Sequence, residues 1–327
     1  MNESTAIEEM IEVLRKAPSV ALFSHISPDG DCIGSMLAIG MALEKMGKEV
    51  SFYNPDPVPR NLAFLPGSSR VKQELPNLVE KTLMFVDCTD LHRVNLTMTE
   101  ISGASTILNL DHHISNEYFG HFNWVDAQAS ASGEVALALI GYLGIEVDRD
   151  MATNLYTAIV TDTGCFQYSN TTANTHRLTA ELLDKEIDLS IIHHNLFDQK
   201  PLAQIKLLQS SLNGLEIHAG GQLATMTLSL EDFQKSGAEQ GMSEGLVNHA
   251  RTIAGVEVAV LLREAGPQVI KVGLRSNLWL NVNEIAAQFG GGGHQRAAGC
   301  ALKLSLSEAK QTLITAIEEA LKVGRNH

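Results

Sequence analysis

The segment "SHISPDGDCIGS" at 24–35 places three cation-binding side chains, His25, Asp29 and Asp31, on one short stretch. It directly follows the apolar run "SVALF", which is typical of a β-strand. Two carboxylates two positions apart repel each other, and aspartate favours neither strands nor helix interiors. A bound cation would offset both effects, so this segment predicts one part of a metal site.

Acidic residues and histidines also end other apolar runs further along the chain. Asp87 ends "LMFVD", and Asp111, His112 and His113 follow "STILNL". Asp162 follows a helical pattern rather than a clear strand. Because ligands bind beyond the carboxyl ends of parallel strands, we expect the strand-borne residues to meet at one edge of a sheet. Carboxylate and imidazole ligands without a thiolate favour Mn²⁺ or a similar ion over a structural zinc.

Each of these residues also has a structural interpretation. Asp-Gly pairs commonly form turns, and an aspartate at a strand end often caps the next helix. The convergence of four such segments favours metal binding. The pair His193–His194 has no acidic residue immediately before it and is interpreted as part of a helix or linker. Cys32, Cys88 and Cys165 adjoin the acidic segments and are interpreted as small buried packing residues.

Composition limits the class of protein. The chain has 327 residues, enough for two domains, with 44% hydrophobic and 19% charged residues. Its net charge of −14 argues against coating long nucleic acid, which needs a broad basic face, but permits a small anionic substrate in a local positive pocket. The four cysteines form no CxxC pair, the N-terminus does not resemble a signal peptide, and no apolar run approaches membrane-spanning length. These features predict a cytoplasmic protein with reduced thiols.

The order of predicted elements indicates an α/β protein with two domains. Short apolar strands alternate with helices over residues 1–190, which predicts a parallel sheet with helices on both faces. After a linker at 191–202, a smaller α+β domain with a mixed sheet is expected over 203–327. Thr5–Glu8 and Ser305–Glu308 resemble capping boxes for the first and last helices. The active site is expected in the cleft between the domains.

Five motifs together resemble the DHH phosphoesterase family. They are "PDGDCIGS" at 28–35, "VDCTD" at 86–90, "DHH" at 111–113, "TDTGCF" at 161–166 and, in the second domain, "GGGGHQRAAG" at 290–299. The last resembles the glycine-rich signature of DHH-associated domain 1. The whole chain is similar to the compact bacterial branch whose members degrade short RNA and 3′-phosphoadenosine-5′-phosphate (pAp).

The resemblance implies a site with two Mn²⁺ ions, for which Mg²⁺ or Co²⁺ could substitute. The implied ligands of the first ion are His25, Asp29 and Asp87, and those of the second are Asp31, Asp87, His112 and Asp162. His113 would face the substrate phosphate, and Asp111 would orient the histidine pair. A hydroxide bridging the ions would attack phosphorus in line with the leaving oxygen.

A second group of residues is expected to bind the substrate. The glycines at 290–293 would allow backbone N–H groups to converge on an anion, as in a nest. The predicted substrate-binding residues are Arg275, Ser276, Gly292, Gly293 and His294. The side chain of Arg296 is interpreted as packing.

The expected activity is hydrolysis of very short oligoribonucleotides, including pApA, to mononucleotides, together with removal of the 3′-phosphate of pAp. A cyclic di-AMP phosphodiesterase shares every motif and remains the alternative. A family II pyrophosphatase, a RecJ-like exonuclease and a catalytically dead nucleotide-binding regulator fit less well. Neither long duplex nucleic acid nor a membrane is an expected partner, and a homodimer is left open.

Overall fold

A computed structural model describes residues 3–324, and the chain divides between Gln199 and Lys200 into two units, each considered by itself. The segment 191–202, expected to be a linker, is mostly helical. It contains the end of α7 (Leu189–His193), a π-helical turn (His194–Asp198) and the start of α8 (Leu202–Asn213). Within the described part of the chain, every helix is too short or too polar to span a bilayer.

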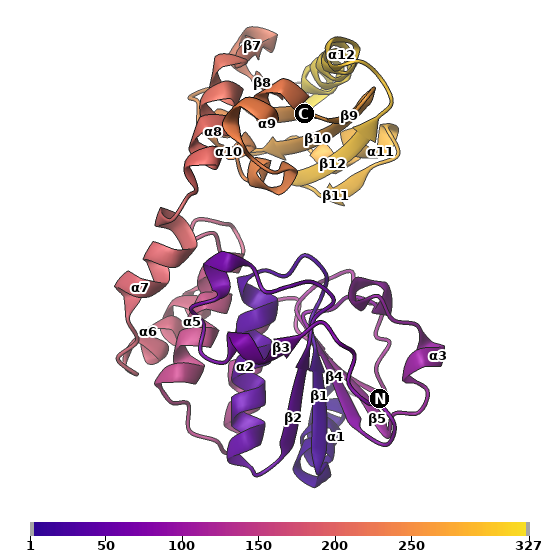
Figure 1. The fold of residues 1–327 in the computed structure, drawn as a ribbon, viewed down its shortest axis with the longest axis vertical. Coiled ribbons are helices and arrows are strands. Elements are labelled where there is room, and N and C mark those ends of the chain that lie inside the picture. Colours follow the sequence, from indigo (N-terminus) through magenta and orange to yellow (C-terminus); the bar gives the residue numbers. More distant parts are fainter. Residues whose placement is uncertain (1–2, 325–327) are drawn as a thin grey trace. The chain divides into compact units, whose positions relative to one another are not determined.

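The first unit is built on a six-stranded sheet in the order β3-β2-β1-β4-β5-β6, with every neighbouring pair parallel (Figure 1). The strands are β1 (Ser19–Phe23), β2 (Glu49–Tyr53), β3 (Val71–Lys72), β4 (Thr82–Val86), β5 (Thr106–Asp111) and β6 (Phe122–Val125). The helices before α7 are α1 (Glu3–Lys16), α2 (Gly30–Lys45), α3 (Met98–Ile101), α4 (Ser132–Tyr142), α5 (Arg149–Asp162) and α6 (Ala173–Leu183). The predicted parallel α/β class is confirmed.

Alternate residues of the central strands bury opposite faces of this sheet. Val20 and Leu22 of β1 join a large core with residues of α1, α2, α4 and α5. Ala21 and Phe23 join a smaller core on the other face. That second face is covered mainly by the 3₁₀ turn at 91–94 and by α3, which are shorter than the helices expected there.

Two details of the first unit differ from expectation. The helix α1 begins at Glu3, so Thr5 lies inside the helix and the predicted capping box with Glu8 is wrong. The strand β6, "FNWV", was not predicted, because four residues with only one fully buried side chain carry little periodicity.

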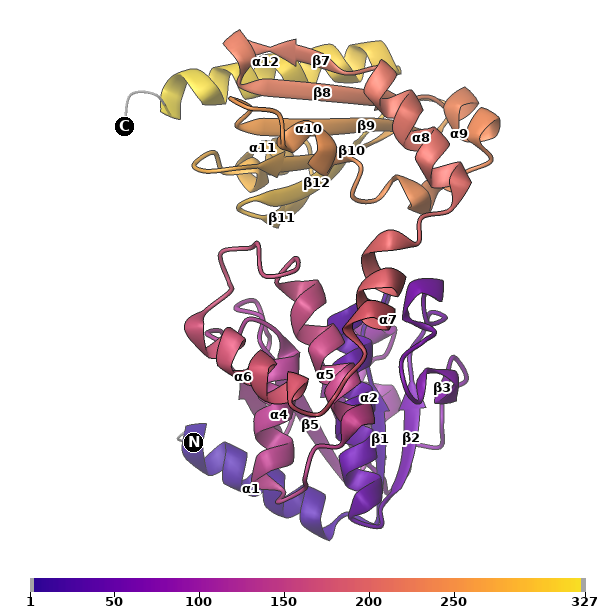
Figure 2. The same cartoon turned by 90° about the vertical axis from the view of Figure 1, so that its left-hand side faces the viewer.

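The second unit has a mixed sheet, as predicted, and its strand order is β11-β12-β10-β9-β8-β7 (Figure 2). Only β8 and β9 are parallel among its paired strands. The strands are β7 (Glu216–His218), β8 (Leu223–Leu228), β9 (Val258–Gly266), β10 (Val269–Ser276), β11 (Gly292–His294) and β12 (Ala297–Leu302). The remaining helices are α9 (Leu230–Ser236), α10 (Val247–Arg251), α11 (Val282–Gln288) and α12 (Leu306–Gly324), the last with the predicted Ser305–Glu308 box.

The two faces of this sheet are covered unequally. The helices α11 and α12 cover one face with a core that includes residues of β8, β9, β10 and β12. On the other face, the helices α8, α9 and α10 form a core with residues of β8 and β9. The residues of β10 that point to this side, Lys271, Gly273 and Arg275, are not buried. We call this uncovered part, over β10, β12 and β11, the open half-face.

Candidate functional site

His25 follows β1 and is buried, with one ring nitrogen committed to the backbone. Its Nδ1 donates to the carbonyl oxygen of Ile26 at 2.8 Å, which leaves Nε2 unprotonated in the neutral ring. That Nε2 lies 3.2 Å from Asp87 Oδ2 and 3.9 Å from Asp29 Oδ1. A nitrogen lone pair and two carboxylates therefore point at one place, which is the donor set of a cation site. Burial alone would lower the pKa of His25, but the bond and charge of Asp87 outweigh it and raise the pKa.

His112, after β5, has the same arrangement. Its Nδ1 donates to the carbonyl oxygen of Ala129 at 3.3 Å. Its Nε2 is buried and has no hydrogen-bond partner. It faces three carboxylate oxygens: Asp162 Oδ2 at 3.6 Å, and Asp31 Oδ2 and Asp87 Oδ1 at 3.7 Å. A buried acceptor without a donor is costly unless another group satisfies it, and a cation would satisfy all four atoms.

Asp87 lies between these two groups. Its Oδ2 faces His25, whereas its Oδ1 faces His112 and accepts from Ser132 Oγ at 2.9 Å. The backbone of Asp87 is left-handed, with φ at 59°, and its N–H donates to the Leu110 carbonyl at 2.9 Å. This conformation is strained for aspartate, and such strain is typical of functional positions. One carboxylate can thus contribute an oxygen to each of two neighbouring cations.

Asp31 is fixed by the N-terminus of α4. Its oxygens accept from the backbone N–H groups of Ser132 at 2.7 Å and Gly133 at 2.9 Å, and from Ser35 Oγ at 3.0 Å. Burial and the neighbouring negative charges of Asp87 and Asp162 nevertheless raise its pKa well above the usual value. Crowding of this kind destabilises the ionised carboxylates unless positive charge is placed among them.

Asp111 contacts the two histidines rather than the ligand cluster. Its Oδ1 accepts from the His112 backbone N–H at 2.8 Å and from His113 Nδ1 at 2.7 Å. Burial opposes protonation of His113, but the bond to Asp111 and the charge of Asp87 raise its pKa to about 9. Asn116, which the sequence did not indicate, donates to Asp111 Oδ2 at 2.6 Å and to Asn109 Oδ1 at 2.8 Å. This chain of bonds fixes the direction of the His113 ring.

Asp29 and Asp162 complete the cluster from the ends of two helices. Asp29 caps α2, and its Oδ1 accepts from Cys32 N–H at 3.0 Å. Asp162 ends α5, where burial raises its pKa to about 6. Cys32 could also donate an atom beside His25 and Asp29, but burial raises its thiol pKa well above the usual value, so oxygen ligands are favoured. All six residues predicted as metal ligands therefore converge.

The second unit brings together some of the predicted substrate-binding residues. His294 pairs with Ala297 across β11 and β12, and Ala297 pairs with Arg275 across β12 and β10. Paired residues point to the same face, so His294 and Arg275 lie on the open half-face with a small alanine between them. Ser276, the next residue along β10, is buried instead, and its Oγ has no hydrogen-bond partner.

The glycine run does not form the expected nest. Residues 292–294 form β11, an edge strand paired with β12. Glycine is required here by close packing: a Cβ at Gly291 would lie 2.2 Å from the Gly299 carbonyl oxygen, and one at Gly293 would lie 2.5 Å from that of Ala297. Arg296 donates to the carbonyl oxygens of Leu278 and Leu280, which agrees with its interpretation as a packing residue.

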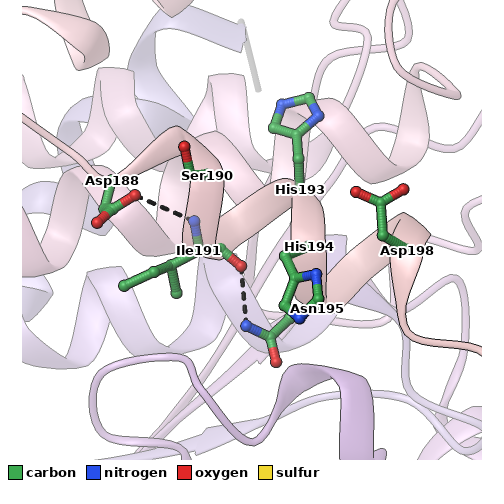
Figure 3. Close-up of a pocket in the computed structure, with 7 residues that line it drawn as sticks. All are labelled: Asp188, Ser190, Ile191, His193, His194, Asn195 and Asp198. Atoms are coloured by element: carbon green, nitrogen blue, oxygen red, sulfur yellow. Dashed lines mark hydrogen bonds between the residues drawn. The ribbon is translucent and has the colours of Figure 1, made fainter.

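His193 and His194 lie elsewhere, at the end of α7 and in the π-helical turn, beside an open depression of about 550 Å³ (Figure 3). The two rings point in different directions in Figure 3. His193 Nε2 is 2.9 Å from the Tyr156 hydroxyl, and its ring packs against Phe197. His194 is exposed. Among the described residues, no acidic group joins either of them in a ligand cluster.

Comparison with known proteins identifies the family. The N-terminal domain of the DHH family matches residues 19–159, and the DHHA1 domain matches 220–323. The bifunctional oligoribonuclease and PAP phosphatase NrnA of Thermus thermophilus is 35% identical over 317 residues, which cover 95% of this chain and 93% of that protein. The chain belongs to the DHH family. The predicted membership and the predicted phosphoesterase class are both confirmed.

Two further similarities are informative. An exopolyphosphatase-related protein from Bacteroides fragilis has the same fold, with a TM-score of 0.88, 27% identity, and coverage of 98% of this chain and 96% of that one. The cyclic-di-AMP phosphodiesterase PdeA of Listeria monocytogenes is 25% identical over 96% of this chain but only 49% of its own length. The chain thus matches NrnA over nearly its full length and PdeA over half of it.

Proposed function

We propose that this DHH-family enzyme hydrolyses very short oligoribonucleotides, including pApA, to mononucleotides and converts pAp to AMP. Its similarity to NrnA over almost all of both chains supports this substrate class. The observation that carries the proposal is the convergence of the Nε2 atoms of His25 and His112 on the carboxylates of the same cluster, where the buried Nε2 of His112 has no hydrogen-bond partner.

These residues fit two divalent ions. The first would be held by His25, Asp29 and Asp87, and the second by Asp31, Asp87, His112 and Asp162. Donors that are all oxygen or imidazole nitrogen favour Mn²⁺, with Mg²⁺ or Co²⁺ as substitutes. When bound, such ions lower the pKa of water and neutralise phosphate charge.

The remaining residues of the site, Asp111, His113 and Asn116, hold a proton on the His113 ring and direct it. His113 Nδ1 donates to Asp111, so the protonated ring presents its Nε2–H away from Asp111. That N–H can donate to a phosphoryl oxygen or to the leaving ribose oxygen as negative charge develops there. Asp111 and Asn116 keep the ring in this orientation, which lowers the cost of reaching the transition state.

Charge supports a preference for short substrates. The protein carries −14, so a long strand would meet repulsion beyond its first few nucleotides. Arg275 supplies local positive charge on the open half-face, and the imidazole of His294 lies on the same face as a hydrogen-bonding group. We therefore expect catalytic efficiency to be highest for RNA of about two to five nucleotides. A cytoplasmic location is part of the proposal and is supported by the four free cysteines.

A substrate panel tests this function. Full-length protein with Mn²⁺ should cleave pApA and the shortest RNAs fastest and convert pAp to AMP, and excess chelator should abolish all three activities. Full activity after thorough chelation would exclude the proposed metal site. Higher efficiency on cyclic di-AMP would favour the alternative that the similarity to PdeA raises. Efficiency that rises up to about 20 nucleotides would contradict the length argument.

A further inference from the structure

Glu134 is a buried carboxylate in the first unit that the chemistry described above does not use. It lies in the first turn of α4 and is 6% exposed. Its Oε1 accepts from Ser130 Oγ at 2.5 Å and from Thr175 Oγ1 at 2.6 Å, and its Oε2 accepts from Asn174 Nδ2 at 3.3 Å. A glutamate in the first turn of a helix is usually exposed to solvent. A buried one that ties α4 to the start of α6 indicates a further role.

The turn 130–133, which enters α4 and is bonded by Glu134, holds two of the implied metal ligands. The backbone N–H groups of Ser132 and Gly133 donate to Asp31. The hydroxyl of Ser132 donates to Asp87. The N-cap residue of α4 is an alanine whose side chain makes no capping bond. The N–H groups at the start of this helix are therefore available to Asp31, which takes the place of a cap.

The same turn is joined to a third implied ligand. Asn170 Nδ2 donates to the Ser130 carbonyl oxygen at 2.9 Å and to the Asp162 carbonyl oxygen at 3.2 Å, and it lies 3.4 Å from Asp162 Oδ2. The turn also packs closely on α5, the helix that ends at Asp162, because a Cβ built at Gly133 would lie 2.7 Å from the Ala158 Cβ. A shift of the turn would therefore disturb several ligands at once.

We propose that Glu134 is a positioning residue for one of the two metal ions. It fixes the turn 130–133, and the turn fixes the carboxylates of Asp31, Asp87 and Asp162. Under the proposed function these three are ligands of the second ion, and Asp87 alone among them is also a ligand of the first. The role of Glu134 rests on the proposed function for the presence of the two ions.

The bonding pattern allows hydrogen bonding to be separated from charge. Ser130 and Thr175 both donate to Oε1 of Glu134. The variant Glu134→Gln can therefore keep both bonds with its amide oxygen, while its amide nitrogen replaces Oε2 beside Asn174, an exposed residue whose amide can turn to accept. The variant Glu134→Met has a similar length and no oxygen acceptor, so the two buried hydroxyls lose their partner.

Titration of the full-length protein with Mn²⁺, followed by calorimetry and by EPR, tests the positioning role. The wild type should bind two ions with the spectrum of a spin-coupled pair. In Glu134→Met the affinity for one ion should fall by about 10- to 100-fold, as when groups that orient metal ligands are removed, and the affinity for the other should stay near the wild-type value. The variant should then give the EPR signal of a single ion at intermediate Mn²⁺ concentrations. Glu134→Gln should bind both ions like the wild type.

Glu257→Met in the second unit is the matched control. Glu257 is also buried, at 4% exposed, and its carboxylate accepts from the backbone N–H groups of residues 278–280. Loss of this acceptor should lower the melting temperature, as in Glu134→Met, and leave the affinity for both ions unchanged. Equally weakened Mn²⁺ binding in the two variants would mean that destabilisation alone explains the effect, and it would overturn the positioning role.

Hydrogen exchange in excess chelator gives a second readout, which needs no bound ion. The N–H groups of Ser132 and Gly133 are protected by their bonds to Asp31. Their exchange should become about tenfold faster or more in Glu134→Met, because the turn opens locally once its anchor is lost. It should stay at the wild-type rate in Glu134→Gln and in Glu257→Met.

Ser130→Ala keeps the role testable if Glu134→Met does not fold. It removes one of the three bonds to Glu134 and should give the same changes at smaller size. Wild-type exchange at both amides, or wild-type affinity for both ions, would overturn the role of Glu134. A wild-type protein that binds no Mn²⁺ would contradict the proposed metal site instead, and the exchange rates would still decide whether Glu134 positions the carboxylates.

Discussion

The chain contains two His-His pairs, and among the described residues only the first lies in a cluster of carboxylates that could hold a metal ion. Around His112–His113, carboxylates come from the start of α2 and from the ends of β4, β5 and α5, and a backbone carbonyl or Asp111 fixes each ring orientation. Around His193–His194, one ring bonds a tyrosine hydroxyl and the other is exposed. A His-His dipeptide alone therefore does not indicate a metal-binding or catalytic site. Function arises where the fold directs several carboxylates at an imidazole nitrogen whose partner nitrogen is already committed.

The largest expected effect comes from removing the carboxylate of Asp87, which lies close to the rings of both His112 and His113. Asp87→Ala should reduce kcat/KM by at least about 10³-fold and lower the bound Mn²⁺, because each implied ion loses a ligand. The matched variant is Asp188→Ala near the second pair, which removes the cap of α7. It should cost about 1 kcal/mol of stability and leave activity and metal content unchanged. Metal analysis and kinetics on pApA measure both. Activity in Asp87→Ala within tenfold of wild type would contradict the bridging role.

The next effect separates the two histidines of the first pair. His112→Ala should lose metal, since its Nε2 faces three carboxylates. His113→Ala should keep most of the metal and lose about 10²- to 10³-fold in kcat, because its ring acts on charge that develops during the reaction. Asp111→Asn should resemble His113→Ala with a smaller loss of about 10- to 100-fold. Equal metal loss in His112→Ala and His113→Ala, by elemental analysis, would refute this division.

A smaller effect concerns stability against pH in the chelated protein. The pKa of Asp162 is raised to about 6, mainly by burial, and that of His113 to about 9, where the bond to Asp111 outweighs burial. A folded-state pKa above the unfolded value means that the folded state binds protons more tightly. The resulting stability is complete below about pH 4 for Asp162 and about pH 6.5 for His113, and it is lost as pH rises through about 6 and about 9.

We therefore expect the melting temperature of chelated protein to fall between about pH 5 and pH 9. Mn²⁺ should reverse the fall at the alkaline end, because a cation stabilises the ionised carboxylates. Asp162→Asn should flatten the acidic part of the profile, and His194→Ala, at the second pair, should leave the whole profile unchanged. A melting temperature that rises across this range would show that the cluster does not behave as crowded carboxylates.

The sequence indicated which residues converge in the first unit, because each of them lies close after an apolar strand or at one end of a helix. Strand order then places these ends together, as parallel sheets generally do. Asn116 and Ser132 were missed because their role depends on bonds to Asp111 and Asp87, which follow from loop conformation rather than from spacing. A polar residue in a loop gives no periodic signal, so only the folded structure reveals such partners.

In the second unit, the sequence indicated which residue types matter but not how the strands arrange them in space. The glycine run was expected to bind an anion through converging N–H groups, but close contact with β12 makes it an edge strand. A cavity of about 260 Å³ on the open half-face, lined by Arg263 and Arg275 among others, was not predicted at all, because it depends on which residues of β9 and β10 are paired. Register is set by tertiary packing, and a one-residue shift would move Arg263 to the other face.

The smallest expected effect is at the second histidine pair itself. His193→Ala removes the bond to the Tyr156 hydroxyl and ring contacts with Tyr156 and Phe197. It should cost about 1–2 kcal/mol in the free energy of unfolding, because the buried Tyr156 loses its partner. His194→Ala, which replaces an exposed ring, should change that free energy by less than about 0.5 kcal/mol.

Neither variant should alter bound Mn²⁺ or kcat/KM, because no carboxylate cluster surrounds the pair among the described residues. Denaturant unfolding and metal analysis on both proteins decide the matter: loss of metal from either one would mean that the second pair also binds a cation, and the contrast between the two pairs would fail.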